Sequence, residues 1–140
     1  MKLVDEFLKT YTLSQHLYEM GQCGNFAKFS VHVYGGERRI PHFHFKNNDE
    51  EGCICLTKAK YYIHSGKTAT LNHSGRKKLM EYLQSIELSS GVPYYEYLCR
   101  KWNKNNRDNP DSQKVQTSAV IPDYLNELGK ADNVIYEHDI

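Results

Sequence analysis

The sequence lacks a long hydrophobic run and an excess of charge of either sign. No window approaches the roughly 18 consecutive apolar residues that a membrane-spanning helix needs, which excludes a transmembrane protein. The 18 Lys and Arg residues nearly balance the 17 Asp and Glu residues, which excludes a strongly basic nucleic-acid coat and an acidic solvating chain. Asp5 and Glu6 stand where a signal peptide has its apolar stretch, so we expect a cytoplasmic protein with no membrane partner.

The sequence also lacks the short motifs of several enzyme classes. It contains no P-loop, no Gly-x-Gly-x-x-Gly fingerprint, no serine-hydrolase elbow and no Cys-x-x-Cys pair. A chain of 140 residues can bury a core without disulfides, so its four cysteines are expected to be reduced thiols. The chain is instead rich in Tyr, with 11, and in His, with 7.

Charge is distributed unevenly along the chain. Residues 1–110 hold 16 Lys and Arg against 11 Asp and Glu, whereas residues 111–140 hold 2 against 6. We therefore expect a single domain over residues 1–110, which includes an N-terminal helix, and an acidic C-terminal extension over residues 111–140. Such an extension either folds back on the basic body or remains solvated, and a solvated tail is the simpler expectation.

Alternation of apolar and polar residues predicts the strands. Phe29, Val31 and Val33 alternate with polar residues within 26–34, and Phe43 and Phe45 alternate with histidines within 40–46. A further strand is expected at 52–57, followed by a hairpin over 59–71 that turns at Ser65-Gly66.

Helical spacing predicts the remaining elements. Helices are expected at 3–20, 74–88, 93–104 and 122–128, and a brief strand at 133–136. Gly21 and Gly24 are expected to end the first helix. The order of elements predicts an α+β fold, with a mainly antiparallel sheet of four to five strands and helices packed on one face.

The ordered series of motifs resembles a small bacterial family classified as a domain of unknown function. The series consists of the strand IPHFHF after a glycine turn, then CICL, YYIHSGKTATLN, the basic helix RKKLMEYLQ and a helix that ends in Trp102. The resemblance covers about residues 26–104 and depends most on the Pro-His-x-His strand. It implies a compact α+β protein and, for some members, toxin–antitoxin-like gene pairs; it implies no settled biochemical activity.

A zinc site is one hypothesis for the histidine strand. Strand alternation places His42 and His44 on one face, and a tight turn at Asn48-Asp49 would set His44 opposite Cys53 and His42 opposite Cys55. Two imidazoles and two thiols form a tetrahedral zinc set. Alternatively, the cysteines simply pack in the core and no cofactor is present; a register slip of one residue would send the thiols to the other face.

Acid–base catalysis is a second hypothesis. His42, His44, His64 and Lys67 lie on or beside one strand-rich segment. Histidines that titrate near neutral pH, together with a cation, are the groups that a metal-free ribonuclease uses as base, acid and phosphate stabiliser. The alternative is that these histidines are idle groups on the polar face of a sheet.

Binding through basic residues is a third hypothesis. Arg76, Lys77 and Lys78 open a helix, where cations oppose the helix dipole, and Arg38 and Arg39 precede the histidine strand. Basic side chains interleaved with tyrosines can hold single-stranded nucleic acid or a phosphorylated partner.

Among these hypotheses, we favour a small cytoplasmic binding or regulatory protein of bacterial or phage origin. Its partner is expected to be nucleic acid or protein, and the family resemblance implies a toxin–antitoxin-like or phage-defence setting. A histidine-dependent, metal-free nuclease or hydrolase is the first alternative, and a zinc-binding domain is the second.

Overall fold

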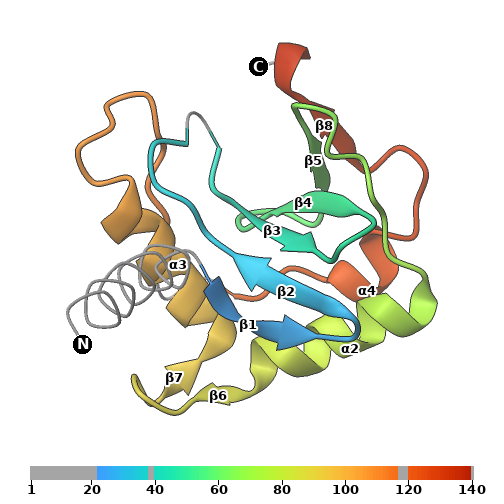
Figure 1. Ribbon diagram of the computed structural model, residues 1–140, viewed down its shortest axis with the longest axis horizontal. Helices are drawn as coiled ribbons and strands as arrows, with labels where there is room; N and C mark the ends of the chain where they lie inside the picture. The colour runs from blue at the N-terminus through green and yellow to red at the C-terminus, as the bar shows by residue number, and fades with distance from the viewer. Residues whose placement is uncertain (1–21, 38–39, 117–119, 140) are drawn as a thin grey trace, which may run out of the picture.

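The computed structural model describes residues 22–37, 40–116 and 120–139 (Figure 1). The helix expected over residues 3–20 and the candidate binding residues Arg38 and Arg39 lie outside these ranges. Within them, no helix has both the length and the apolar character that crossing a membrane requires.

A six-stranded sheet forms the centre of the described fold. Its strand order is β1-β2-β3-β4-β5-β8, and every neighbouring pair is antiparallel except β5 and β8, which are parallel. The strands are β1 (Gln22–Phe26), β2 (Phe29–His32), β3 (His42–Lys46), β4 (Glu51–Cys55), β5 (Tyr61–Ile63) and β8 (Val134–Tyr136).

The α+β class is confirmed, but the expected count of four to five strands is too low. Strand β1 contains Gly24 at φ +117° beside an irregularity in its pairing with β2, so its sequence shows no clean alternation. Strand β8 joins the sheet from about 70 residues beyond its partner, and no local pattern specifies that pairing.

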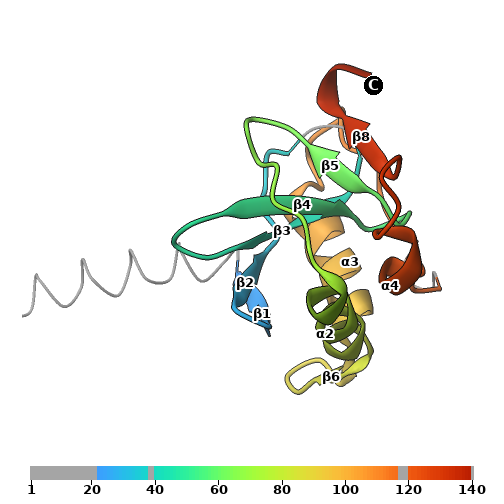
Figure 2. The same cartoon turned by 90° about the vertical axis from the view of Figure 1, so that its right-hand side faces the viewer.

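Three helices pack on one side of the sheet (Figure 2). They are α2 (His73–Gln84), α3 (Tyr94–Asn105) and α4 (Tyr124–Glu127). Helix α2 ends before the predicted boundary at residue 88, because Ser85 caps it and Ile86–Glu87 (β6) then pairs with Val92–Pro93 (β7). A 3-10 turn at Glu137–Asp139 (η1) follows β8.

The hydrophobic core lies between the helices and the sheet. Its buried members include Val31, Phe43, Phe45, Ile54, Leu79, Leu83, Leu98, Trp102 and Tyr124.

The β3–β4 hairpin has the register that the zinc hypothesis assumes, and not the alternative slipped by one residue. His42 lies opposite Cys55 and His44 opposite Cys53. The side-chain oxygen of Asn47 accepts hydrogen bonds from the backbone of the next turn residues, which fixes the short connection. At Gly52, an added Cβ would lie 2.4 Å from the Ala69 carbonyl oxygen, so glycine is what permits β4 and the segment after β5 to approach so closely.

The acidic C-terminal segment folds back on the body. Tyr124 is fully buried, and its hydroxyl donates a 2.6 Å hydrogen bond to the carbonyl of Cys55. Strand β8 pairs with β5 along all three of its residues (Figures 1 and 2). Of the two alternatives for this segment, the described part of 111–140 therefore supports packing on the sheet rather than a solvated tail.

Candidate metal centre

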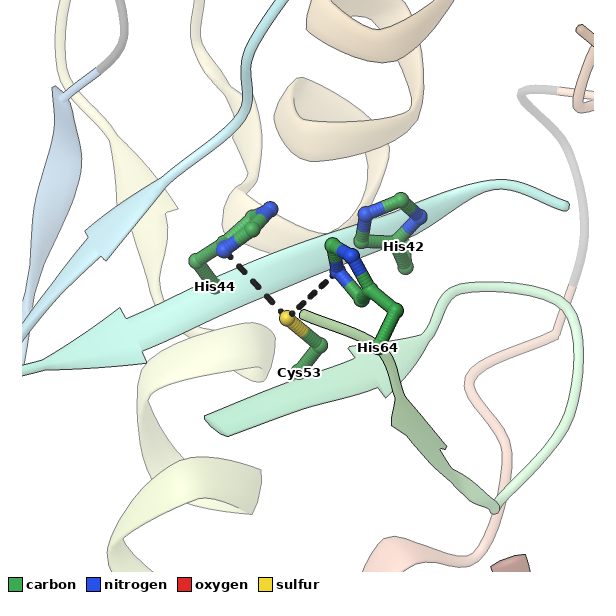
Figure 3. A group of neighbouring side chains, drawn as sticks. All are labelled: His42, His44, Cys53 and His64. Atoms are coloured by element: carbon green, nitrogen blue, oxygen red, sulfur yellow. Dashed lines mark hydrogen bonds between the residues drawn. The ribbon is translucent and has the colours of Figure 1, made fainter. Parts of the chain in front are cut away.

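Four side chains converge beside β3: His42, His44, Cys53 and His64. Each offers one ligand atom, and all four atoms lie within 4.8 Å of one another. Figure 3 shows both β3 histidines projecting from the same side of the strand, with Cys53 entering from β4 and His64 from the segment after β5. The group is therefore able to hold a metal ion.

Strand geometry explains how the chain assembles this cluster. Alternation places His42 and His44 on the face opposite Phe43, and the antiparallel register sets Cys53 directly across from His44. Strand β5 pairs with β4 and ends at Ile63, so His64 emerges next to the thiol. The turn that follows His64 has positive φ at Ser65 and Gly66, as expected, but only one bridge, between His64 and Lys67, continues the predicted hairpin.

The imidazole of His42 is buried and held in one orientation. Its Nδ1 donates to the carbonyl of Ile40 at 2.9 Å, so the neutral ring carries its lone pair on Nε2. The ring packs against Tyr62 and Trp102, with centroid separations of 4.8 and 5.1 Å. Among the described residues, its buried Nε2 has no hydrogen-bond partner, which is the one orphaned polar atom of the cluster.

The imidazole of His44 lies between two carboxylates. Its Nδ1 is 2.8 Å from Glu51 Oε2, and its Nε2 is 3.1 Å from Glu37 Oε1. Cys53 Sγ lies 3.2 Å from His44 Nδ1 and 3.2 Å from His64 Nε2. The cluster thus combines three imidazoles and one thiol with two carboxylates at its edge.

Burial controls the protonation of these groups. Burial raises the pKa of the Cys53 thiol well above its usual range, and the charges of Glu51 and Glu37 raise it further. Burial also lowers the pKa of His64, which favours its neutral, ligand-competent form. Burial alone would raise the pKa of Glu37, but its interactions with His42 and His44 outweigh this effect and keep it ionised.

Three residues of the expected zinc set, His42, His44 and Cys53, lie close together, but the fourth, Cys55, does not join them. Cys55 lies opposite His42 as predicted, but it is not among the mutually close ligand atoms. Its side chain is buried in a small apolar cluster with Ile40 and Tyr62, and burial raises the pKa of its thiol to about 12. His64 takes the place of Cys55.

The four candidate catalytic residues are also close together, but they are not equally accessible. His42 and His44 are each 1% exposed, whereas His64 and Lys67 are half-buried at the turn. The Lys67 backbone donates to the carbonyl of His64 at 2.9 Å, and its charge slightly opposes protonation of that ring. Lys67 thus borders the cluster.

Two of the expected basic binding residues on α2 lie open at the surface, and one does not. Lys77 and Lys78 are exposed. Arg76 is half-buried: its Nε donates to the carbonyl of Leu125 and its Nη1 to that of Leu71, both at 2.9 Å. Arg76 therefore fastens α4 and the start of α2 together.

Replacing Arg76 by methionine is expected to lower the free energy of unfolding by about 1–3 kcal/mol, because two partly buried carbonyls lose charged donors. Urea denaturation measures this change. Lys77→Met is the matched control and should change stability by less than about 0.5 kcal/mol, since Lys77 is exposed. Equal effects of the two substitutions would contradict the structural role of Arg76.

Glu37 and Glu51 are the cluster residues that sequence patterns do not single out. Glu51 shares the strand face of Cys53, so alternation within β4 offers a signal for it. Glu37 lies in the loop between β2 and β3, where no periodicity exists. Comparison of the chain with protein-family models, curated proteins and solved structures finds no match, so the interpretation of the site depends on its own geometry.

Proposed function

We propose that this protein binds a divalent transition-metal ion, zinc above all, in the cluster of His42, His44, Cys53 and His64. The observation that carries the proposal is the buried His42 Nε2, whose lone pair has no hydrogen-bond partner among the described residues. A buried polar atom without a partner is costly, and a bound cation satisfies it. The Nδ1 hydrogen bond to Ile40 is the arrangement by which metal-binding histidines are usually oriented.

The donor set and its spacing suit zinc. Zn–N bonds of about 2.0–2.1 Å and Zn–S bonds of about 2.3 Å place neighbouring donors of a tetrahedral site about 3.3–3.6 Å apart. Cys53 Sγ lies 3.2 Å from His64 Nε2, and the four ligand atoms all lie within 4.8 Å of one another. Small shifts of these side chains open the group around an ion, and mixed nitrogen and sulfur donors favour zinc over magnesium or calcium.

The burial of the cluster supports a structural role for the ion. His42, His44 and Cys53 are each 1% exposed or less, and an ion whose ligands are all protein side chains has no open position for water or a substrate. A closed site of this kind fastens β3, β4 and the turn after β5 together. It favours the binding and regulatory role over the hydrolase alternative. In this proposal the exposed Lys77 and Lys78 remain available for a nucleic-acid or protein partner.

Elemental analysis of protein purified without a histidine tag tests the proposal. We expect about one zinc ion per chain, and we expect His42→Ala to lose it. Cys55→Ser is the matched control, because Cys55 is as buried as Cys53 but lies outside the group of ligand atoms. A wild-type chain that holds no metal after incubation with Zn²⁺ and gel filtration would overturn the proposal, as would equal losses in both variants.

A further inference from the structure

The carboxylate of Glu37 faces the two histidines of β3. Its Oε1 lies 3.1 Å from His44 Nε2, and its Oε2 lies 3.8 Å from His42 Nε2. Its side chain is 23% exposed, so it reaches the buried imidazoles from the rim of the cluster. An ionised carboxylate only accepts hydrogen bonds. Its interaction with each imidazole therefore depends on whether the facing nitrogen carries a proton or a lone pair.

The hydrogen bonds on the far side of each ring identify the nitrogens. His42 Nδ1 donates to the carbonyl of Ile40, and His44 Nδ1 donates to Glu51 at the shorter of its two contacts, 2.8 Å against 3.2 Å to Cys53. The His42 ring therefore carries its lone pair on Nε2 when it is neutral, and so does the neutral His44 ring, whereas a protonated His44 donates from Nε2 to Glu37 at 3.1 Å. The Glu37 carboxylate, His42 Nε2 and His44 Nε2 thus converge on one point. Either the proton of a charged His44 or a bound cation that displaces this proton balances the carboxylate there.

The backbone of Glu37 is fixed from outside the sheet. Its carbonyl accepts a hydrogen bond from Asn109 Nδ2 at 2.8 Å and another from the hydroxyl of Ser112. These contacts tie the loop between β2 and β3 to the segment after α3. The carboxylate is thus positioned before any ion binds, as a preorganised ligand should be.

We propose that Glu37 is a further ligand of the same ion, which it binds together with the Nε2 atoms of His42 and His44. The inference rests on the proposed function and names a donor that the four-residue group does not include. It also balances charge, because a dipositive ion with the Cys53 thiolate alone would leave one positive charge buried, and the Glu37 carboxylate neutralises it. The ion then also fastens the loop between β2 and β3 to the sheet.

Two substitutions at position 37 distinguish a carboxylate that binds the metal from one that acts only through its charge. Glu37→Gln keeps the shape of the side chain but offers a poor donor, so the Kd for Zn²⁺ in a chelator competition should rise by at least about 100-fold. Glu37→His removes the charge but supplies a good nitrogen donor, and it should recover at least about tenfold of that loss. The visible absorption of the Co²⁺-loaded protein should differ between wild type and Glu37→Gln, because the number of donors changes.

Glu50→Gln is the matched control, since Glu50 pairs with Lys28 in the turn between β3 and β4, at the end of β3 away from the loop that carries Glu37. It should leave both the Zn²⁺ affinity and the Co²⁺ spectrum unchanged. If Glu37→Gln binds Zn²⁺ as tightly as the wild type, or if Glu37→His is as weak as Glu37→Gln, Glu37 is not a ligand. Those results leave the metal site itself intact, whereas a wild-type protein that binds neither ion overturns the proposed function.

Discussion

Trp102→Ala is expected to lower the free energy of unfolding by about 3–5 kcal/mol, a larger loss than Arg76→Met should cause. Trp102 is fully buried in α3, and its indole Nε1 donates a 2.8 Å hydrogen bond to the carbonyl of Gln113. Truncation leaves a large cavity between the helix layer and the sheet, and it also leaves that carbonyl without its donor. Urea denaturation with an unchanged m-value measures the loss.

Trp102 also forms one wall of the candidate metal centre. Its ring lies 5.1 Å from that of His42, so its removal should loosen this imidazole and weaken Zn²⁺ binding as well. Ile86→Ala is the matched apolar control, because Ile86 is 51% exposed, and it should change stability by less than about 0.5 kcal/mol. A Trp102→Ala protein as stable as the Ile86→Ala protein would contradict the placement of Trp102 in the core.

Removal of the proposed zinc ion is expected to produce the second largest effect. An ion that binds only the folded state stabilises it by about 2.7 kcal/mol at a free concentration 100 times Kd, and by about 4.1 kcal/mol at 1,000 times Kd. The ligands come from β3, β4 and the turn after β5, so the unfolded chain has no preformed site. Thermal unfolding with buffered Zn²⁺ and with a chelator measures the difference.

The stabilisation by zinc should weaken as the pH falls. Burial, together with the charges of Glu51 and Glu37, raises the pKa of the Cys53 thiol, so the metal-free protein keeps that proton at neutral pH and must release it when the ion binds. Each released proton makes the apparent affinity fall by about tenfold per unit of decreasing pH. His64→Ala should abolish the response to zinc. A midpoint of thermal unfolding that changes with neither Zn²⁺ nor chelator would contradict the coupling between zinc binding and folding.

The β3–β4 hairpin shows how far local patterns predict a site. Alternation places His42 and His44 on one face, and the short polar turn sets the register that brings Cys53 opposite His44. Both facts depend only on residues within one hairpin, and both are confirmed. The same pattern places Cys55 opposite His42, but it does not reveal that a residue from another strand lies closer to the cluster.

Local sequence patterns do not predict that the side chains of His64 and Glu37 reach the cluster. The position of His64 depends on how β5 pairs with β4, which is set by the single register pair Ile54 and Tyr61. The position of Glu37 depends on hydrogen bonds from Asn109 and Ser112, more than 70 residues further along the chain. Neither long-range contact leaves a periodic signal in the sequence.

The sequence by itself determined the α+β class, the common face of His42 and His44 on β3 and the approximate places of helices α2, α3 and α4. These features depend on the spacing of apolar residues and on turn chemistry, which act between near neighbours in the chain. The tertiary structure alone decided that the sheet has six strands, that Arg76 holds two segments together and that His64 completes the cluster. Those features arise when distant segments bury shared surface and satisfy one another's polar groups, so their cause lies in packing rather than in any stretch of sequence.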